Sequence, residues 1–259
     1  MRLFLQIMDV ITSTQNRTIK LFRSLSEKKF RKGEGLFAVE GGNLVRDIPP
    51  SADVRFVLAT PARAEEAEAR FSGTGAQVYL VSDEVMKSVS DTVTPYGLAA
   101  AVALPEREFS LPEGNAVLLD GVSDPGNLGT VIRTAAATGF GDVYLLGCAD
   151  AYAPKTVRAS MGGIFRVRVF DVDEDGAVRL ASATRSAALD MAGEDIFSAH
   201  LSAPVLIVAG SEAHGVRESV LRASREVLAL PMTGGMESLN VAVAAGVAMY
   251  NVFSQSNNR

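Results

Sequence analysis

Residues 241–253 form a helical run without a single charged side chain. Apolar or small residues cover every side of this run, which predicts a helix buried in a core or against a partner subunit. A short apolar strand at residues 227–230 precedes it and stops at Pro231, because proline cannot donate to a strand ladder. A glycine-containing loop at residues 233–235 and a polar segment at residues 237–240 lie between strand and helix. Polar groups beside a strand end, at the mouth of a buried helix, are typical of a ligand site in an α/β protein.

The composition is that of a globular protein with an ample core. The chain has 259 residues, of which 47% are hydrophobic and 21% charged, enough for one large or two ordinary domains. Cys148 is the only cysteine, which excludes a disulfide framework and favours a reducing compartment, most simply the cytoplasm. Residues 1–11 are predicted to form an ordered leader and not a signal peptide, because Gln6 and Asp9 interrupt their apolar character. No apolar run reaches the length that spans a membrane.

The net charge of −5 conceals an uneven distribution. Residues 1–35 carry eight basic and three acidic side chains, a net +5, and the rest of the chain carries −10. A basic segment of this kind favours contact with the phosphates of RNA, although a solvated helix surface gives the same pattern. The predicted RNA contacts are basic residues of this segment and of a later helix at residues 153–162: Arg17, Lys20, Lys28, Lys29, Arg31, Lys32, Lys155 and Arg158.

Strands and helices alternate through both halves of the chain, which indicates an α/β protein. In the first half the predicted strands are residues 36–40, 54–59, 77–81 and 98–104, consistent with a small α/β sandwich. Residues 105–114 contain two prolines and alternating charges and are the natural linker. In the second half the predicted strands are residues 116–119, 143–146, 166–169 and 205–209, with an acidic surface loop at 171–175. We therefore predict domains at residues 1–104 and 115–259.

A helix is predicted directly after the strand at residues 116–119. Asn127 stands where an N-cap belongs, and apolar or small residues at 128, 131, 132, 135 and 136 follow helical spacing. Gly139 is a plausible stop. Arg133 falls outside the apolar stripe, so its side chain is expected to point away from the core.

Three segments, in order, resemble the motifs of the SpoU/TrmH branch of the SPOUT methyltransferases. They are NLGTVIRTA at residues 127–135, IVAGSEAHG at 207–215 and LPMTGGMESLNVAVA at 230–244. Enzymes of this branch transfer a methyl group from S-adenosylmethionine to a ribose 2′-hydroxyl of RNA. The resemblance implies a parallel sheet with a deep trefoil knot in the C-terminal domain and a homodimer formed through that domain.

The N-terminal half resembles the substrate-binding domain that precedes many SpoU-type catalytic domains and grips RNA. The resemblance lies in residues 11–25 (ITSTQNRTIKLFRSL), 37–41 (FAVEG) and 94–97 (TPYG). Because this domain is similar to the partner found in ribosomal enzymes, the resemblance favours 23S ribosomal RNA over transfer RNA as substrate.

Methyl transfer from a sulfonium to a hydroxyl needs a held donor, an aligned oxygen and an acceptor for one proton, but no metal. His200, His214 and Cys148 cannot build a metal cluster, and of these only His214 is a candidate for contact with substrate. By resemblance Arg133 is the functional arginine of the first motif. Its guanidinium stays protonated, with a pKa above about 12. Holding the neighbouring phosphate or stabilising the forming alkoxide therefore suits it better than proton abstraction.

The other catalytic candidates are polar residues of the three motifs. Asn127 matches the motif-one asparagine, with a helix cap alone as the alternative. Glu212 is expected to orient Arg133 or Asn127. Ser238 and Asn240 match the polar pair of the third motif and can bond the donor, the ribose or the loops, although a helix N-cap explains Ser238 equally well.

The candidate donor-binding residues come from the second and third motifs. Gly210 and Gly215 let the loop backbone approach the adenosine, and Leu230, Met232 and Leu239 form its apolar wall, although ordinary core residues would look identical. The full predicted set is Ala209, Gly210, Gly215, Leu230, Met232, Ser238 and Leu239.

Two other classes of protein remain open. A nucleotide-dependent oxidoreductase would share the strand–helix alternation, but the sequence lacks its G-x-G-x-x-G fingerprint and also lacks a G-x-x-x-x-G-K-[ST] phosphate loop. An RNA-binding assembly factor could keep the fold and lose catalysis. The intact polar motif residues argue against it, and within the enzyme class transfer RNA remains the alternative substrate.

Overall fold

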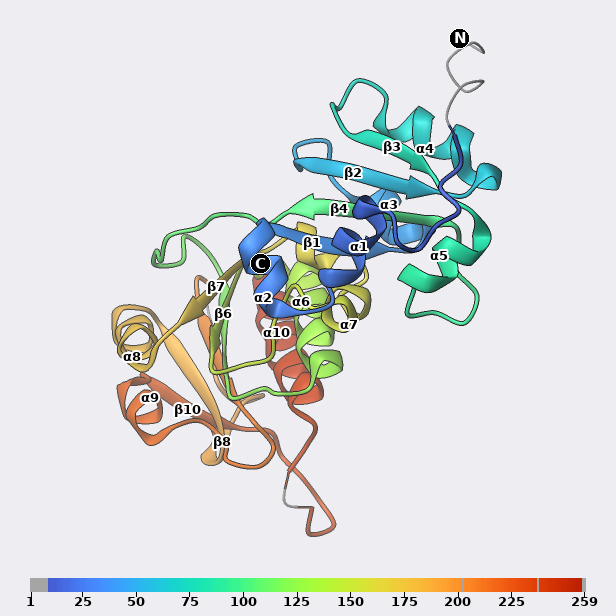
Figure 1. Ribbon diagram of the computed structural model, residues 1–259. Coiled ribbons are helices and arrows are strands. Elements are labelled where there is room, and N and C mark those ends of the chain that lie inside the picture. The colour runs from blue at the N-terminus through green and yellow to red at the C-terminus, as the bar shows by residue number, and fades with distance from the viewer. Residues whose placement is uncertain (1–8, 202, 237, 258–259) are drawn as a thin grey trace. The chain divides into compact units, whose positions relative to one another are not determined.

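The computed structural model describes residues 9–201, 203–236 and 238–257, so most of the predicted leader lies outside the described residues. The chain forms two compact units (Figure 1). The first comprises residues 1–106 together with Tyr152–Arg158, and the second comprises Arg107–Ala151 and Ala159–Arg259. The domain boundaries predicted from the sequence place residues 152–158 in the second domain, whereas the structure assigns them to the first unit.

The first unit is built on a four-stranded sheet with the order β1-β4-β2-β3. Its strands are β1 (Leu36–Glu40), β2 (Val54–Ala59), β3 (Gln77–Leu80) and β4 (Leu98–Ala103). Only the β2–β3 pair is parallel. Its helices are α1 (Arg17–Ser24), α2 (Lys28–Glu34), α3 (Gly42–Asp47), the 3-10 turn η2 (Pro61–Arg63), α4 (Ala64–Phe71) and α5 (Asp83–Val89). All four strands expected from the sequence of this half are present.

Residues 152–158 join the first unit through an aromatic contact and ion pairs. The ring of Tyr152 packs on that of Phe37 in β1, with 5.0 Å between centroids. Arg158, in α7 (Pro154–Ala159), forms ion pairs with Glu40 and Asp91. Such contacts between residues far apart in sequence leave no local signal, which is why the sequence did not predict them.

The second unit is built on a six-stranded sheet with the order β10-β8-β9-β5-β6-β7, in which every adjacent pair is parallel. The strands are β5 (Ala116–Asp120), β6 (Asp142–Leu146), β7 (Arg168–Val172), β8 (Ser186–Asp195), β9 (Leu206–Gly210) and β10 (Glu226–Ala229). The helices are α6 (Pro125–Thr138), the 3-10 turn η3 (Gly163–Phe165), α8 (Glu174–Ala183), α9 (Glu218–Ala223) and α10 (Val241–Asn257).

Helices cover both faces of this sheet (Figure 1). Helices α6 and α10 pack together on one face, and α8 and α9 pack together on the other. Side chains alternate between the faces along each strand, so Leu118 and Tyr144 join the core under α8, which contributes Leu180.

The sequence did not predict helix α8. The acidic segment at residues 171–175, predicted as a surface loop, instead ends β7 and begins α8. Asp173 caps this helix, because its side chain accepts a hydrogen bond from the Gly176 N–H at 2.8 Å.

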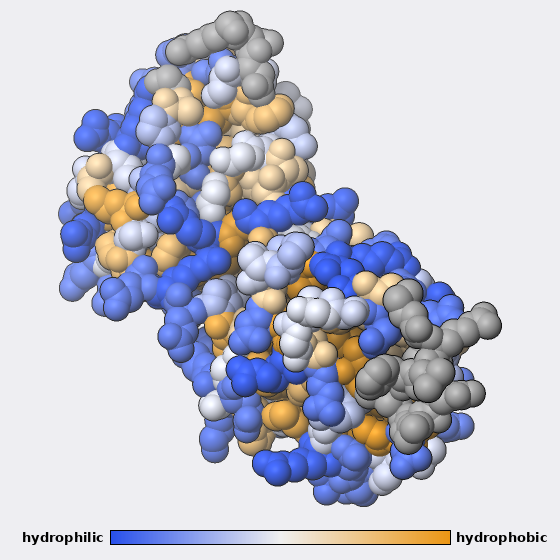
Figure 2. All heavy atoms as spheres, turned by 90° about the horizontal axis from the view of Figure 1, so that it is seen from above, coloured by the Kyte–Doolittle hydropathy of each residue, from blue (hydrophilic) through white to orange (hydrophobic). Residues whose placement is uncertain are grey.

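Helix α10 is buried along one side only. Ala245, Met249 and Val252 are fully buried, whereas Val243 and Tyr250 are 51% and 53% exposed. The uncharged sequence predicted that every side of this helix is buried, either in a core or against a partner subunit. Within one chain, only the side that carries Ala245, Met249 and Val252 is buried. No helix among the described residues has the length and apolar character needed to cross a membrane. On the face shown in Figure 2, hydrophilic side chains cover most of the surface and apolar ones fill small areas between them.

Candidate active site

A cavity of about 350 Å³ opens in the second unit, where the ends of β9 and β10 meet the start of α10. It has the size typical of a site for a small ligand, roughly 300–1,000 Å³. All of the predicted donor-binding residues line it: Ala209, Gly210, Gly215, Leu230, Met232, Ser238 and Leu239. Glu212 and His214 also line it. The fold therefore brings the second and third motifs to one place.

A hydrogen-bonded triad joins the three motifs beside this cavity. Oε1 of Glu212 accepts from the side-chain amides of Asn127 and Asn240 at 3.0 and 3.2 Å. The same oxygen accepts from the backbone N–H of Val241 at 3.1 Å, and the Asn240 amide also donates to Oδ1 of Asn127 at 2.9 Å. The sequence predicted that Glu212 orients Arg133 or Asn127, and in the structure it is bonded to Asn127.

The caps of the two helices differ from those predicted. Asp124 caps α6, accepting from the N–H of Asn127 at 2.8 Å, with Pro125 in the first position that suits proline. Asn127 is thus inside the first turn and its side chain remains available for the triad. Asn240 caps α10, with Oδ1 accepting from Ala242 N–H at 3.0 Å. Ser238 is therefore not the cap.

Two glycines set the shape of the loop after β9. A Cβ on Gly210 would lie 1.9 Å from the carbonyl carbon of Gly215, and Gly215 has a positive φ of 65°. Only glycine permits the first contact, and glycine is favoured in the second conformation. The predicted reason for these glycines was close approach to the donor, and the structure adds close approach within the loop itself.

Arg133 lies apart from the triad. It follows Asn127 by six positions on α6, about 9 Å along the helix axis, and its side chain is exposed. It forms no hydrogen bond or ion pair with any other described residue, so its guanidinium is available to an RNA phosphate or ribose. Its backbone is fixed by η3, because a Cβ on Gly163 would lie 2.9 Å from Cα of Arg133.

The cavity has a further wall that the sequence did not predict. Leu189, Asp190 and Met191 of β8 line it. An available signal was the placing of Asp190 inside an otherwise apolar segment, AALDMAG, which fits neither face of a buried strand. Among the described residues, the lining of the cavity carries the carboxylates of Asp190 and Glu212 but no lysine or arginine. Within the described parts of the chain, no group of three or more His, Cys, Asp or Glu side chains is placed to hold a metal ion.

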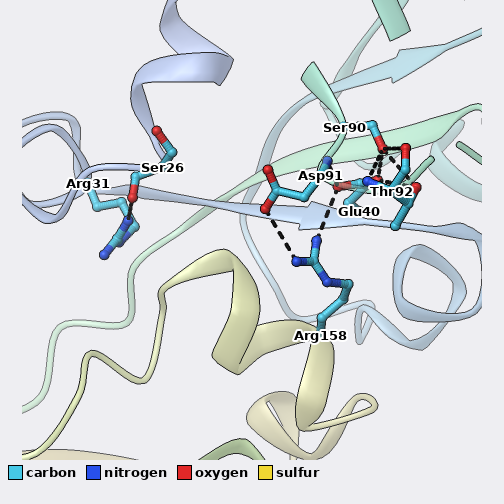
Figure 3. A network of polar contacts seen from close by, with 7 residues as sticks. All are labelled: Ser26, Arg31, Glu40, Ser90, Asp91, Thr92 and Arg158. Atoms are coloured by element: carbon cyan, nitrogen blue, oxygen red, sulfur yellow. Dashed lines mark hydrogen bonds and ion pairs between the residues drawn. The ribbon is translucent and has the colours of Figure 1, made fainter. Parts of the chain in front are cut away.

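Two of the basic residues predicted to contact RNA instead bind other groups within the first unit (Figure 3). Arg31 is only 3% exposed, and its Nη1 donates to the carbonyls of Leu25 and Ser26 at 2.7 and 2.8 Å. Arg158 pairs with Asp91 at 3.3 Å and with Glu40 at 3.5 Å. Burial removes Arg31 from the surface that RNA could reach, and Arg158 meets phosphate only in competition with two carboxylates. The remaining candidates are exposed: Arg17, Lys20, Lys28, Lys29, Lys32 and Lys155.

Comparison with known protein families identifies the family to which this chain belongs. Residues 114–250 match the SpoU rRNA methylase family and residues 16–100 match the MRM3-like substrate binding domain. The chain therefore belongs to the SpoU family of RNA methyltransferases, and the predicted family, α/β class and type of enzyme are confirmed.

The chain resembles particular family members over nearly its whole length. It is 32% identical over 255 residues to the 23S rRNA (guanosine(2553)-2′-O)-methyltransferase RlmP of Bacillus subtilis, covering 95% of this chain and 99% of the relative. A TrmH-family RNA methyltransferase structure from Porphyromonas gingivalis matches with a TM-score of 0.84 and 32% identity, covering 94% of this chain and 100% of that one. The AdoMet-bound rRNA methyltransferase from Sinorhizobium meliloti matches with a TM-score of 0.85 and 27% identity, covering 95% and 97%.

Proposed function

We propose that this protein transfers a methyl group from S-adenosylmethionine to a ribose 2′-hydroxyl of 23S ribosomal RNA. The observation that carries the proposal is the cavity of the second unit, in which the predicted donor-binding residues of two separate motifs form one wall beside the Asn127–Glu212–Asn240 triad. A bound S-adenosylmethionine would supply an electrophilic methyl group there.

The chemistry of the lining favours this donor over a nicotinamide dinucleotide. The methyl donor carries a positive sulfonium and suits a cavity whose described lining has two carboxylates and no basic side chain. A pyrophosphate in the same place would face Asp190 and Glu212 without compensation. The S. meliloti relative, whose structure contains AdoMet, supports the same choice.

The residues of this chain hold the donor and the RNA, and they stabilise the charge that forms on the 2′-oxygen. Leu230, Met232 and Leu239 offer an apolar surface for the adenine, and Gly210 and Gly215 shape the loop beside it. The triad fixes Asn127 and Asn240 where the ribose of the RNA would approach, with Ser238 at the cavity wall. Arg133 holds the adjacent phosphate or stabilises the 2′-oxygen as its proton leaves, since a permanent cation suits both tasks.

RNA binding is proposed for the first unit, which contains the predicted domain at residues 1–104. Exposed basic residues of α1 and α2, Lys20, Lys28, Lys29 and Lys32 among them, support it, as does the match to a substrate-binding domain. RlmP, whose name gives 23S ribosomal RNA as its substrate, favours that RNA over transfer RNA.

A homodimer through the second unit is also part of the proposal. An apolar groove supports it, lined by Val243, Val247 and Tyr250 of α10 with Phe197 beside them, because exposed apolar surface of this kind marks contact sites. Sedimentation should give twice the chain mass, and a monomer at micromolar concentration would contradict the dimer. The trefoil knot and a cytoplasmic location, the latter consistent with a free cysteine, complete the proposal.

Calorimetric titration with S-adenosylmethionine and, separately, with NADH tests the donor. We expect the first to bind and the second not to bind. Transfer of labelled methyl groups to 23S ribosomal RNA, with transfer RNA as the parallel substrate, then tests the target. Binding of neither ligand would favour the assembly-factor alternative, and methylation of transfer RNA alone would replace the proposed substrate.

A further inference from the structure

Strand β8 leaves its ladder with β10 for several residues. Val227 and Leu228 are consecutive on β10, yet they pair with Ala188 and Glu194 on β8. Residues 189–193 are therefore an excursion from the sheet, far longer than the single extra residue of an ordinary bulge. Large irregularities of this kind re-aim side chains and are common beside active sites.

The backbone of the excursion is held by a packing contact and a hydrogen bond. A Cβ on Gly193 would lie 2.5 Å from the backbone N of Leu228, so the returning backbone packs directly on β10. At the other end, Oδ1 of Asp190 accepts from the N–H of Ala192 at 2.9 Å. The second oxygen of Asp190 makes no hydrogen bond or ion pair with the described residues.

The excursion occupies the middle of the cavity wall. In the sheet β8 lies between β9 and β10, so residues 189–191 separate the loop that follows β9 from the apolar end of β10. The β10 side offers Leu228, Leu230 and Met232, and the β9 side offers Ser211, Glu212 and His214. From the strand order, Asp190 is placed between the apolar side and the polar side of one cavity.

We propose that Asp190 binds the ribose hydroxyls of the methyl donor. The assignment rests on the proposed function. In S-adenosylmethionine the ribose joins the apolar adenine to the charged sulfonium end, which matches the order of surfaces along the wall. An ionised carboxylate is an acceptor only, and its hydrogen bonds with hydroxyl donors are strong. Carboxylates in dinucleotide-binding folds recognise ribose hydroxyls in the same way.

The test removes the charge without removing the turn. Asp190→Asn keeps one oxygen for the Ala192 N–H and replaces the second carboxylate oxygen with an amide NH₂ group. Asp195→Asn is the matched control, because Oδ1 of Asp195 accepts from the N–H of Phe197 at 2.8 Å in the same kind of turn. Asp195 is on the same strand and is not part of the cavity wall. Binding of S-adenosylhomocysteine and of its 2′,3′-dideoxy analogue would be measured by calorimetry for each protein.

We expect Asp190→Asn to weaken S-adenosylhomocysteine binding about tenfold or more, and Asp195→Asn to leave it unchanged. Loss of the ribose hydroxyls should weaken binding to the wild-type protein by a similar factor and have little further effect in Asp190→Asn, since both changes remove one contact. Unchanged affinity in Asp190→Asn, or two losses that multiply, would overturn the assignment. If the wild-type protein bound neither S-adenosylmethionine nor S-adenosylhomocysteine, the proposed function itself would fail.

Discussion

The two units place the polar residues that the sequence singled out in very different ways. In the second unit, residues chosen from ordered motifs meet: Asn127, Glu212 and Asn240 form one hydrogen-bonded group beside one cavity. In the first unit, residues chosen from charge composition lie in different environments. Arg31 is buried and bonded to carbonyls, and Arg158 is paired with carboxylates, while the lysines nearby are exposed.

The difference shows how much information each kind of pattern contains. A motif specifies residue types at fixed spacings relative to a strand end or a helix start, and the fold then dictates where they meet. A net charge specifies only that a segment prefers water or phosphate on average. It cannot distinguish a lysine that stays in solvent from an arginine whose planar group satisfies several carbonyls inside the protein.

The largest expected effect is at Arg133. Arg133→Ala should lower the methyl transfer rate by about 10²–10³-fold, because it removes the one cation expected at the 2′-oxygen. Donor affinity should stay within a few fold, as Arg133 does not line the cavity. Single-turnover transfer and calorimetry measure the two quantities, with Arg222→Ala, an exposed arginine of α9, as control. Lost donor binding would show that its role had been misassigned.

The second-largest effect is expected in the loop that follows β9 and lines the cavity of the second unit. Gly210→Ala should lower the free energy of unfolding by about 1–3 kcal/mol and weaken donor binding, because the added Cβ meets the backbone of Gly215. Gly141→Ala is the control, since no atom lies within 4 Å of its added Cβ. Urea unfolding and calorimetry give both values. A Gly210→Ala protein with full stability would mean that this loop has room that the structure lacks.

A contrast between neighbouring residues tests the first unit. Arg31→Ala should reduce the free energy of unfolding by about 1–3 kcal/mol, because the buried carbonyl of Leu25 and the partly buried carbonyl of Ser26 lose their donor. Lys32→Ala, at an exposed position, should change it by less than about 0.5 kcal/mol.

Replacing Lys28, Lys29 and Lys32 together should instead act on RNA binding. The magnitude of the slope of log affinity against log salt should fall by about 2–3, as each of three phosphate contacts contributes about 0.7–0.9. An unchanged slope would identify these lysines as a solvated surface.

The smallest effect concerns the thiol of Cys148, which follows β6 in the second unit and lies outside the cavity lining. Burial raises the pKa of Cys148 to about 11, and its thiol donates to the carbonyl of Leu119. The raised pKa keeps the thiol neutral at pH 8, so alkylation by iodoacetamide should be slow and should accelerate up to about pH 11. An ordinary thiol would reach half of its maximal rate near pH 8.5 and accelerate little above about pH 9.5. Fast reaction at pH 8 would show an activated cysteine there.

Much of the fold could be predicted because it depends on local patterns. Short apolar runs gave the strands of the first unit, and the positive φ of Gly139 ends α6 where the sequence placed a stop. Strand β8 and helices α8 and α9 were missed. Strand β8 contains the charged Asp190 in its excursion and ends in Glu194 and Asp195, and α8 begins in an acidic segment that is equally typical of a surface loop.

The sequence by itself determined the class of enzyme, the order of the motifs and the uncharged helix α10, since these depend on residues close together in the chain. Tertiary structure decided which side chains share a site. Asn127 and Asn240 bond across 113 positions, and Asp190 reaches the cavity because β8 is inserted between β9 and β10. A side chain's partners are fixed when distant strands pair and their ends converge, and no local pattern records that convergence.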